Sequence, residues 1–178
     1  MQTAAVIGRS FAFKILETLP GLDNEIKLCL LRLQSLELIY EKKVFPELEY
    51  IFRNIITQEV AYNSLLSNRR KEIHGSVGKA IEKMYPNRIE EFYEVIALHF
   101  SKSNHHESAF KYLKLAGDKS IQNNSAWEAF VFYKKAFEIA GQHLKGKEQE
   151  ELGLLHAMVS PIIILNFPEE SLKFLEQG

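Results

Sequence analysis

The chain has 178 residues, of which 46% are hydrophobic and 25% charged, with 22 Lys and Arg against 23 Asp and Glu. This length suits one ordinary domain or two small ones, and the apolar content excludes a disordered chain. The formal net charge of -1 provides no overall field that would attract nucleic acid or an anionic membrane. The single cysteine, Cys29, cannot form an intrachain disulfide, so we expect a reducing, cytoplasmic location.

The sequence contains no segment that predicts export or a membrane span. No basic leader opens the chain, and its start is apolar. The most apolar stretch, 158–167, is shorter than a bilayer requires and contains Ser160, Pro161 and Asn166. Because such an apolar start is typical of a chain cut within a longer one, we expect the sequence to be a piece of a larger protein.

The first part of the chain predicts two helices followed by a β-hairpin. Apolar residues over 11–19 predict a short helix that Pro20 and Gly21 terminate. A second helix, from Asp23 to about Leu36, has apolar residues on a broad face, so we expect it to be buried. Two short β-rich runs, at 38–40 and 50–53, flank a charged turn that includes Phe45 and Pro46. This order of elements is typical of a winged helix.

Every later periodic segment is helical. The predicted helices cover 55–66, 73–84, 88–101, a segment from about Glu107, a segment from Ser125, and 148–165, which would pair with 168–177. Ser125 and Glu128 predict a capping box, in which each side chain binds a backbone N–H at the helix start. The breaks at 123–125, Gly146 and Pro168 separate these helices.

Two of these helices share a pattern that resembles the second helix of a tetratricopeptide repeat. The segments 109–116 and 129–136 both run from a small residue through aromatic residues to a small residue. Ala97 and Gly117 lie twelve residues before them, where such a repeat needs a small residue for close helix packing. The copies are only 20 residues apart, against a period of about 34, so one helix must serve in both pairs.

Together these elements predict a mainly α protein with two parts. We expect a winged-helix-like domain with a short β-hairpin and a connecting helix over 1–85. Antiparallel helix pairs of a tetratricopeptide-like α-solenoid follow over 86–178, truncated at the C-terminus.

The motifs that suggest chemistry have a plainer interpretation. Residues 141–148 match a phosphate-binding loop except that Glu148 replaces the Ser or Thr that holds magnesium. The match links two helices and does not follow a strand, which favours a solvated loop. The run 105–107 (His-His-Glu) lacks the further ligands of a metal site and favours a polar turn. Cys29 lies in an apolar helix, where a buried residue is favoured over a nucleophile. We therefore predict no catalytic and no metal-binding residues, and rank an enzyme with a pocket between the helices last.

A winged helix can bind DNA, and this stays the alternative function. The helix that would read DNA carries Lys27 and Arg32, which Asp23, Glu25 and Glu37 offset. The best basic cluster is 69–71 (Arg-Arg-Lys), at a helix start where positive charge opposes the macrodipole. Because phosphate contacts need clustered Lys or Arg, we expect no nucleic acid partner.

Aromatic residues on the later helices could form a partner-binding surface. At helical spacing such residues also commonly form the core, and both interpretations stay open. The candidate residues are Tyr93, Phe100, Tyr112, Trp127 and Tyr133.

Several short blocks, in a fixed order, carry a family resemblance. They are 4–11 (AAVIGRSF), 21–23 (GLD), 33–39 (LQSLELI), 50–53 (YIFR), 58–66 (QEVAYNSLL) and 69–74 (RRKEIH). They resemble the region after the ATPase core in STAND-class signalling ATPases, which include bacterial adenylate/guanylate cyclase-associated predicted ATPases and related transcriptional regulators. The resemblance covers nearly the whole chain.

This resemblance implies a regulatory arm for signal transduction. In such proteins the winged helix packs on the nucleotide-binding domain, and the helical repeats bind a partner and hold or release the ATPase. The expected partners are therefore an upstream ATPase domain of the same protein and an unknown protein or peptide on the repeats. ATP or ADP and Mg²⁺ belong to the parent protein, with no cofactor in this chain. Asn54 stands where the family commonly has a nucleotide-sensing His; its amide can donate to phosphate but cannot carry a proton or charge.

Overall fold

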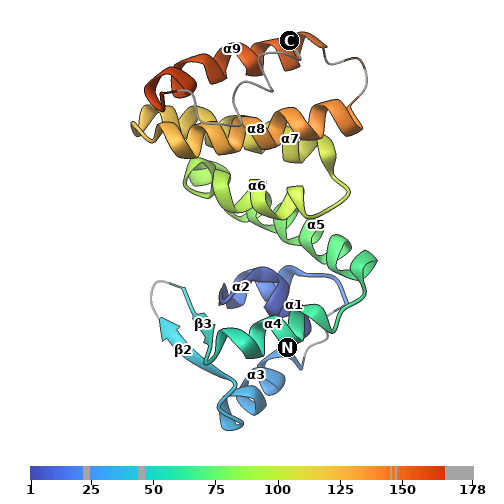
Figure 1. Ribbon diagram of the computed structural model, residues 1–178. Coiled ribbons are helices and arrows are strands. Elements are labelled where there is room, and N and C mark those ends of the chain that lie inside the picture. The colour runs from blue at the N-terminus through green and yellow to red at the C-terminus, as the bar shows by residue number, and fades with distance from the viewer. Residues whose placement is uncertain (22–24, 44–46, 145, 147, 167–178) are drawn as a thin grey trace. The chain divides into compact units, whose positions relative to one another are not determined.

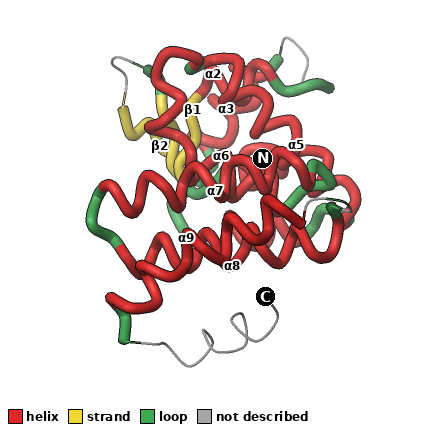
Figure 2. Tube along the Cα trace, turned by 90° about the horizontal axis from the view of Figure 1, so that it is seen from above, coloured by secondary structure: helices red, strands yellow, loops and turns green. Residues whose placement is uncertain are grey.

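The computed structural model describes residues 1–21, 25–43, 47–144, 146 and 148–166. The chain is mainly α, with one small antiparallel sheet, as the sequence predicted (Figures 1 and 2). It forms two compact units, the first of which comprises Met1–Asn87 and Lys102–Asn104. The expected domain boundary after residue 85 lies close to this division and stays a prediction.

Helices of different lengths and three short strands make up the first unit. In chain order the elements are α1 (Gln2–Ile7), β1 (Ser10–Ala12), α2 (Phe13–Thr18), α3 (Ile26–Ser35), β2 (Ile39–Lys43), β3 (Glu49–Phe52), α4 (Ile55–Asn63) and α5 (Ser67–Met84). Strand β3 is central and pairs antiparallel with both β1 and β2. A strand, two helices and a hairpin that closes on that strand are a winged-helix arrangement, so the predicted fold of this part is confirmed.

The prediction of one helix over 11–19 was wrong. Residues 10–12 form β1, and the helix begins only at Phe13. Phe11 is buried between Tyr50 and Phe52, with ring centroids 5.7 Å apart in both pairs. Pairing with β3 therefore overrides the helical spacing, and a strand of three residues is too short to show alternation in the sequence. Helix α1 was not predicted either.

Helix α4 is shorter than its apolar residues suggested. It ends at Asn63, whereas Leu65 and Leu66 were expected to belong to it. Leu66 instead occupies the N-cap position of α5, and 82% of its surface is exposed. Apolar residues in a connection thus imitate a continuing helix. The expectations for Asp23, Phe45 and Pro46 lie outside the described residues.

Consecutive packed helices build the second unit. They are η1 (Pro86–Phe92, a 3-10 helix that begins in the first unit), α6 (Tyr93–Ser101), α7 (His106–Gln122), α8 (Ala126–His143) and α9 (Glu148–Ile164). Helix α7 packs against both α6 and α8, and α8 packs against α9. The expectation that one helix serves in two pairs is confirmed. The predicted partner of α9, at 168–177, lies outside the described residues.

Gly117 marks a close approach of α7 and α8. A Cβ atom at this position would lie 2.4 Å from Cε1 of Tyr133, closer than non-bonded atoms approach. Ala97, at the equivalent position of α6, is fully buried. The sequence prediction of small residues at these two positions is therefore confirmed.

Ser125 occupies the N-cap position of α8, as predicted, but the predicted capping box does not form. Its side chain makes no cap hydrogen bond. Its ψ of 77° departs from the extended conformation that directs a capping hydroxyl toward the first turn. The backbone N–H of Ser125 instead donates to the carbonyl of Ser120 over 2.8 Å, which closes the end of α7.

Asn124, in the same turn, has a left-handed backbone with a φ of 58°. We expect Asn124→Val to lower the free energy of unfolding by about 1–2 kcal/mol, because a β-branched residue is strained in this conformation. Asn124→Gly should be neutral or stabilising by up to about 1 kcal/mol. Urea unfolding of the two variants checks this, and equal stabilities would contradict it.

Candidate functional site

The segment that resembles a phosphate-binding loop connects two helices. Gly141 lies within α8, and Glu148 is the first residue of α9. A phosphate-binding loop follows a buried strand, whereas the segment here begins within the last turn of a helix of 18 residues. The predicted interhelical position is confirmed; Lys145 and Lys147 lie outside the described residues.

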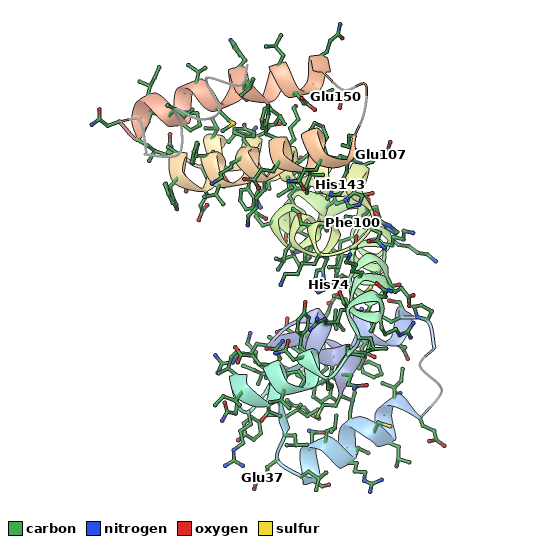
Figure 3. All side chains as sticks on the ribbon, turned by 45° about the vertical axis from the view of Figure 1, so that its right-hand side comes forward. Glu37, His74, Phe100, Glu107, His143 and Glu150 are labelled. Carbon is green, nitrogen blue, oxygen red and sulfur yellow. The ribbon has the colours of Figure 1, made fainter. Side chains whose placement is uncertain are left out.

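The two adjacent histidines make ring contacts. The ring of His106 stacks on His143, with centroids 3.8 Å apart and 15° between planes, so the start of α7 meets the end of α8. Figure 3 labels Glu107 and His143 at these two helix ends. The ring of His105 lies 5.8 Å from that of Phe100. Within the described residues, no three His, Cys, Asp or Glu side chains gather as a metal site requires.

Three of the five aromatic candidates for partner binding lie in the core. Phe100, Tyr112 and Tyr133 are 0–2% exposed. The Phe100 and Tyr112 rings stack at 5.9 Å, and Tyr93, which is half-buried, lies 6.0 Å from Tyr112. Trp127 is 58% exposed. Of these candidates, Trp127 is therefore the best placed to meet a partner.

Tyr133 combines burial with a hydrogen bond that its phenol donates to Asp118 over 2.7 Å. Burial, and then the Asp118 carboxylate, raise the pKa of Tyr133 far above its ordinary value. The unfolded chain ionises first, so this contribution to stability is complete below about pH 10 and is lost as the pH rises beyond it. We expect Tyr133→Phe to flatten the loss of stability between neutral and alkaline pH, as measured by urea unfolding. An unchanged profile would contradict this.

Most of the basic triplet at the start of α5 contacts neighbouring side chains. Arg69 pairs with Glu72 at 2.9 Å. Arg70 donates to Asn63 over 3.1 Å, and its guanidinium lies 5.0 Å from the centre of the Tyr62 ring. Arg69 and Arg70 of the basic triplet therefore already contact side chains of the first unit. This makes the triplet less suitable for binding DNA phosphates.

Asn54 is the N-cap of α4. Its side-chain oxygen accepts a hydrogen bond of 2.9 Å from the backbone N–H of Ile56. The chain therefore has a structural use for this residue, independent of any nucleotide. Its correspondence to the sensor His of the resembling family stays a prediction.

We expect Asn54→Ala to destabilise the first unit by about 1 kcal/mol, because an amide N–H of α4 loses its acceptor. Asn54→Asp should retain most of the stability, since a carboxylate also accepts this bond and suits a helix N-terminus. Thermal unfolding of both variants checks the cap. Equal losses for Ala and Asp would contradict it.

Helix α3 is largely exposed, so the prediction that it is buried on a broad face was wrong. Leu30 alone among its ten residues is fully buried. Leu28 and Leu31 are 64% and 62% exposed, and Cys29 is exposed rather than buried as expected. The physical reason is position: α3 lies at the periphery of the first unit and packs mainly beside β2 (Figures 1 and 3). The rest of the unit covers one face of α3 and leaves the other face exposed.

We call Lys27, Leu28, Leu31 and Arg32 the outer face of α3. Leu28 and Leu31 lie one turn apart, on the same side of the helix. At about 100° per residue, Lys27 and Arg32 flank them on opposite sides. No residue of Ile26–Ser35 is acidic. The face is thus apolar along its centre and basic along both edges.

Behind α3 lies a cavity of about 260 Å³. Most of its wall is apolar, and its lining includes Ala4, Leu16, Ile26, Leu30 and Leu33. Ligand sites for drug-sized molecules usually measure about 300–1,000 Å³. The volume of this cavity lies just below that range.

Helix α4 carries a second exposed apolar pair. Ile56 and Val60 are 61% and 63% exposed and lie one turn apart. The sequence predicted that these residues lie on a helix but did not predict their exposure. The spacing of apolar residues in the sequence predicts a helix. Whether those residues are buried depends on tertiary neighbours, which the spacing does not specify.

Comparisons with known proteins add no family assignment. No protein-family model matches the chain, and no curated protein or solved structure matches it either. Among the described residues, no helix is both long and apolar enough to cross a bilayer.

Proposed function

We propose that this chain is a non-catalytic regulatory and protein-interaction module of a larger, cytoplasmic, STAND-class signalling ATPase. Its winged-helix unit would couple to an upstream ATPase domain that binds ATP or ADP with Mg²⁺. Its helical unit would bind a protein or peptide effector. The block order in the sequence motivates the family, and the surface of the winged-helix unit supports an interaction role.

The observation that carries the proposal is the exposure of leucines where a DNA reader would present cations. In a winged helix that reads DNA, the helix before the hairpin enters the major groove. Here that helix exposes Leu28 and Leu31, and α4 exposes Ile56 and Val60. Exposed apolar side chains of this kind favour burial against a protein surface. The DNA phosphate backbone offers no apolar groups for these side chains to contact.

The test begins with the coding sequence upstream of the codon for Met1. We expect it to encode an ATPase core with an intact phosphate-binding loop, and this region should co-purify with the chain when the two are co-expressed. Val60→Glu should lower the amount of ATPase core that co-purifies with the chain by at least about tenfold, because it places a charge in the apolar contact. Leu152→Ser, at a 63% exposed position of α9, is the matched control and should leave the amount unchanged.

Two results would overturn the proposal. One is an upstream sequence without an ATPase core; the other is ATP hydrolysis by the isolated chain. Binding of duplex DNA at low salt, with an affinity that falls steeply as salt rises, would support the alternative of a DNA-binding regulator.

A further inference from the structure

The outer face of α3 has the charge pattern of a binding site for a helix. Its centre is formed by Leu28 and Leu31, each more than half exposed. Lys27 and Arg32 border this centre on the two sides. Helix α3 itself contributes no carboxylate to neutralise them. Such a face complements a surface that is apolar along its middle and acidic along its edges.

The nearby carboxylates do not neutralise these two cations. Glu37, just after the helix, pairs with Arg53, and Glu41 accepts a hydrogen bond of 3.2 Å from Gln34. Glu25, at the N-cap of α3, forms no ion pair with either cation among the described residues, and Asp23 lies outside them. Within the described residues, neither Lys27 nor Arg32 forms an ion pair, although the Lys27 ammonium lies 5.8 Å from the centre of the Phe13 ring. Their charges therefore remain available to a partner.

The length and shape of the face select the kind of partner. Ten helical residues span about 15 Å, which matches about three turns of another helix packed alongside. Two cations are too few for the cluster of phosphate contacts that holds DNA, and they would leave both leucines uncovered. An amphipathic helix would cover both leucines and place its acidic residues beside the cations.

We propose that the outer face of α3 binds an amphipathic helix of a separate protein, whose apolar stripe is flanked by Asp or Glu. This inference rests on the proposed function, because it names the chemistry of one partner of the interaction module. The ATPase core would contact α4, and the acidic helix would contact α3. Since the face is small, the dissociation constant should lie in the micromolar range.

The test uses the full chain and two synthetic helical peptides of about 18 residues, both with leucine at every third or fourth position. In one peptide glutamate flanks the leucines, and in the other lysine does. Fluorescence anisotropy of labelled peptides should show that the acidic peptide binds at least about tenfold more tightly than the basic one.

Variants of the outer face identify the binding site. Leu31→Ser should lower the affinity for the acidic peptide by at least about tenfold, because an apolar contact at the centre of the face is lost. Combining Lys27→Glu with Arg32→Glu should reverse the preference, so that the basic peptide binds more tightly. The matched control is Leu66→Ser, a more exposed leucine of the same unit, which should leave both affinities unchanged. Circular dichroism confirms that each variant is folded.

The outcomes separate this inference from the proposed function. Equal affinity for the two peptides, or binding that Leu31→Ser leaves unchanged, would overturn the inference, while co-purification with the ATPase core through α4 would still stand. Salt-sensitive binding of duplex DNA that Arg32→Glu abolishes would also overturn it, in favour of a DNA contact. Reversal of the peptide preference would support it even if no ATPase core lay upstream.

Discussion

Replacing Gly117 by alanine is expected to lower the free energy of unfolding of the second unit by about 1–2 kcal/mol. In most helix interiors this substitution is stabilising, because alanine has the higher helix propensity. At Gly117 the new Cβ would meet three atoms of the Tyr133 ring, the nearest at 2.4 Å. The ring cannot move away easily, since it is 2% exposed and its hydroxyl is bound to Asp118. Gly117→Leu should cost more than about 3 kcal/mol.

Gly153→Ala supplies the matched control for this substitution. Gly153 lies inside α9, and a Cβ there would meet no atom within 4 Å. Alanine should therefore stabilise the chain by up to about 1 kcal/mol. Fluorescence of Trp127, the single tryptophan, reports unfolding of the second unit. If Gly117→Ala and Gly153→Ala changed stability in the same direction, the close approach of α7 and α8 would be wrong.

A double-mutant cycle tests the contact itself. Tyr133→Leu removes the ring that a Cβ at position 117 would meet, at the cost of a cavity and of the hydrogen bond to Asp118. If the ring is the obstacle, Gly117→Ala should cost less in the Tyr133→Leu background than in the natural chain. Additive losses would indicate that the helix backbone, and not the tyrosine, resists the alanine.

The helical half could be predicted from the sequence because its determinants are local. The small residues Ala97 and Gly117 precede the segments 109–116 and 129–136 by the same twelve residues, and this spacing locates a buried small residue on each of two consecutive helices. Helices α7 and α8 appear close to their expected limits for the same reason. Neighbours in the sequence are neighbours in space in such a unit.

The winged-helix half was predicted less completely, because its determinants lie far apart in the chain. Ser10–Ala12 becomes a strand only through pairing with residues 49–51, about 40 positions later. Helix α3 has the same leucine-rich pattern as a buried helix, yet nothing in its own sequence specifies whether another layer covers it. The candidate docking surfaces on α3 and α4 were missed for that reason: burial is a property of the assembled unit.

Truncating Phe100 to alanine is expected to destabilise the second unit by about 3–5 kcal/mol, the usual cost of removing a fully buried aromatic ring. Phe100 is 0% exposed and stacks on Tyr112 at 5.9 Å, so its removal leaves a cavity between α6 and α7. This distinguishes a core residue from a partner-binding one. If Phe100 served a partner, its truncation would weaken binding and leave the fold unchanged.

Trp127→Ala completes this comparison, because it removes a larger ring from a position that is 58% exposed. We expect it to change the free energy of unfolding by no more than about 0.5 kcal/mol, the usual range for surface substitutions. Calorimetry suits both variants, since it does not depend on the tryptophan. A loss at Trp127 as large as that at Phe100 would mean that the indole is part of the core. A small loss at both positions would mean that the α6–α7 contact does not stabilise the unit.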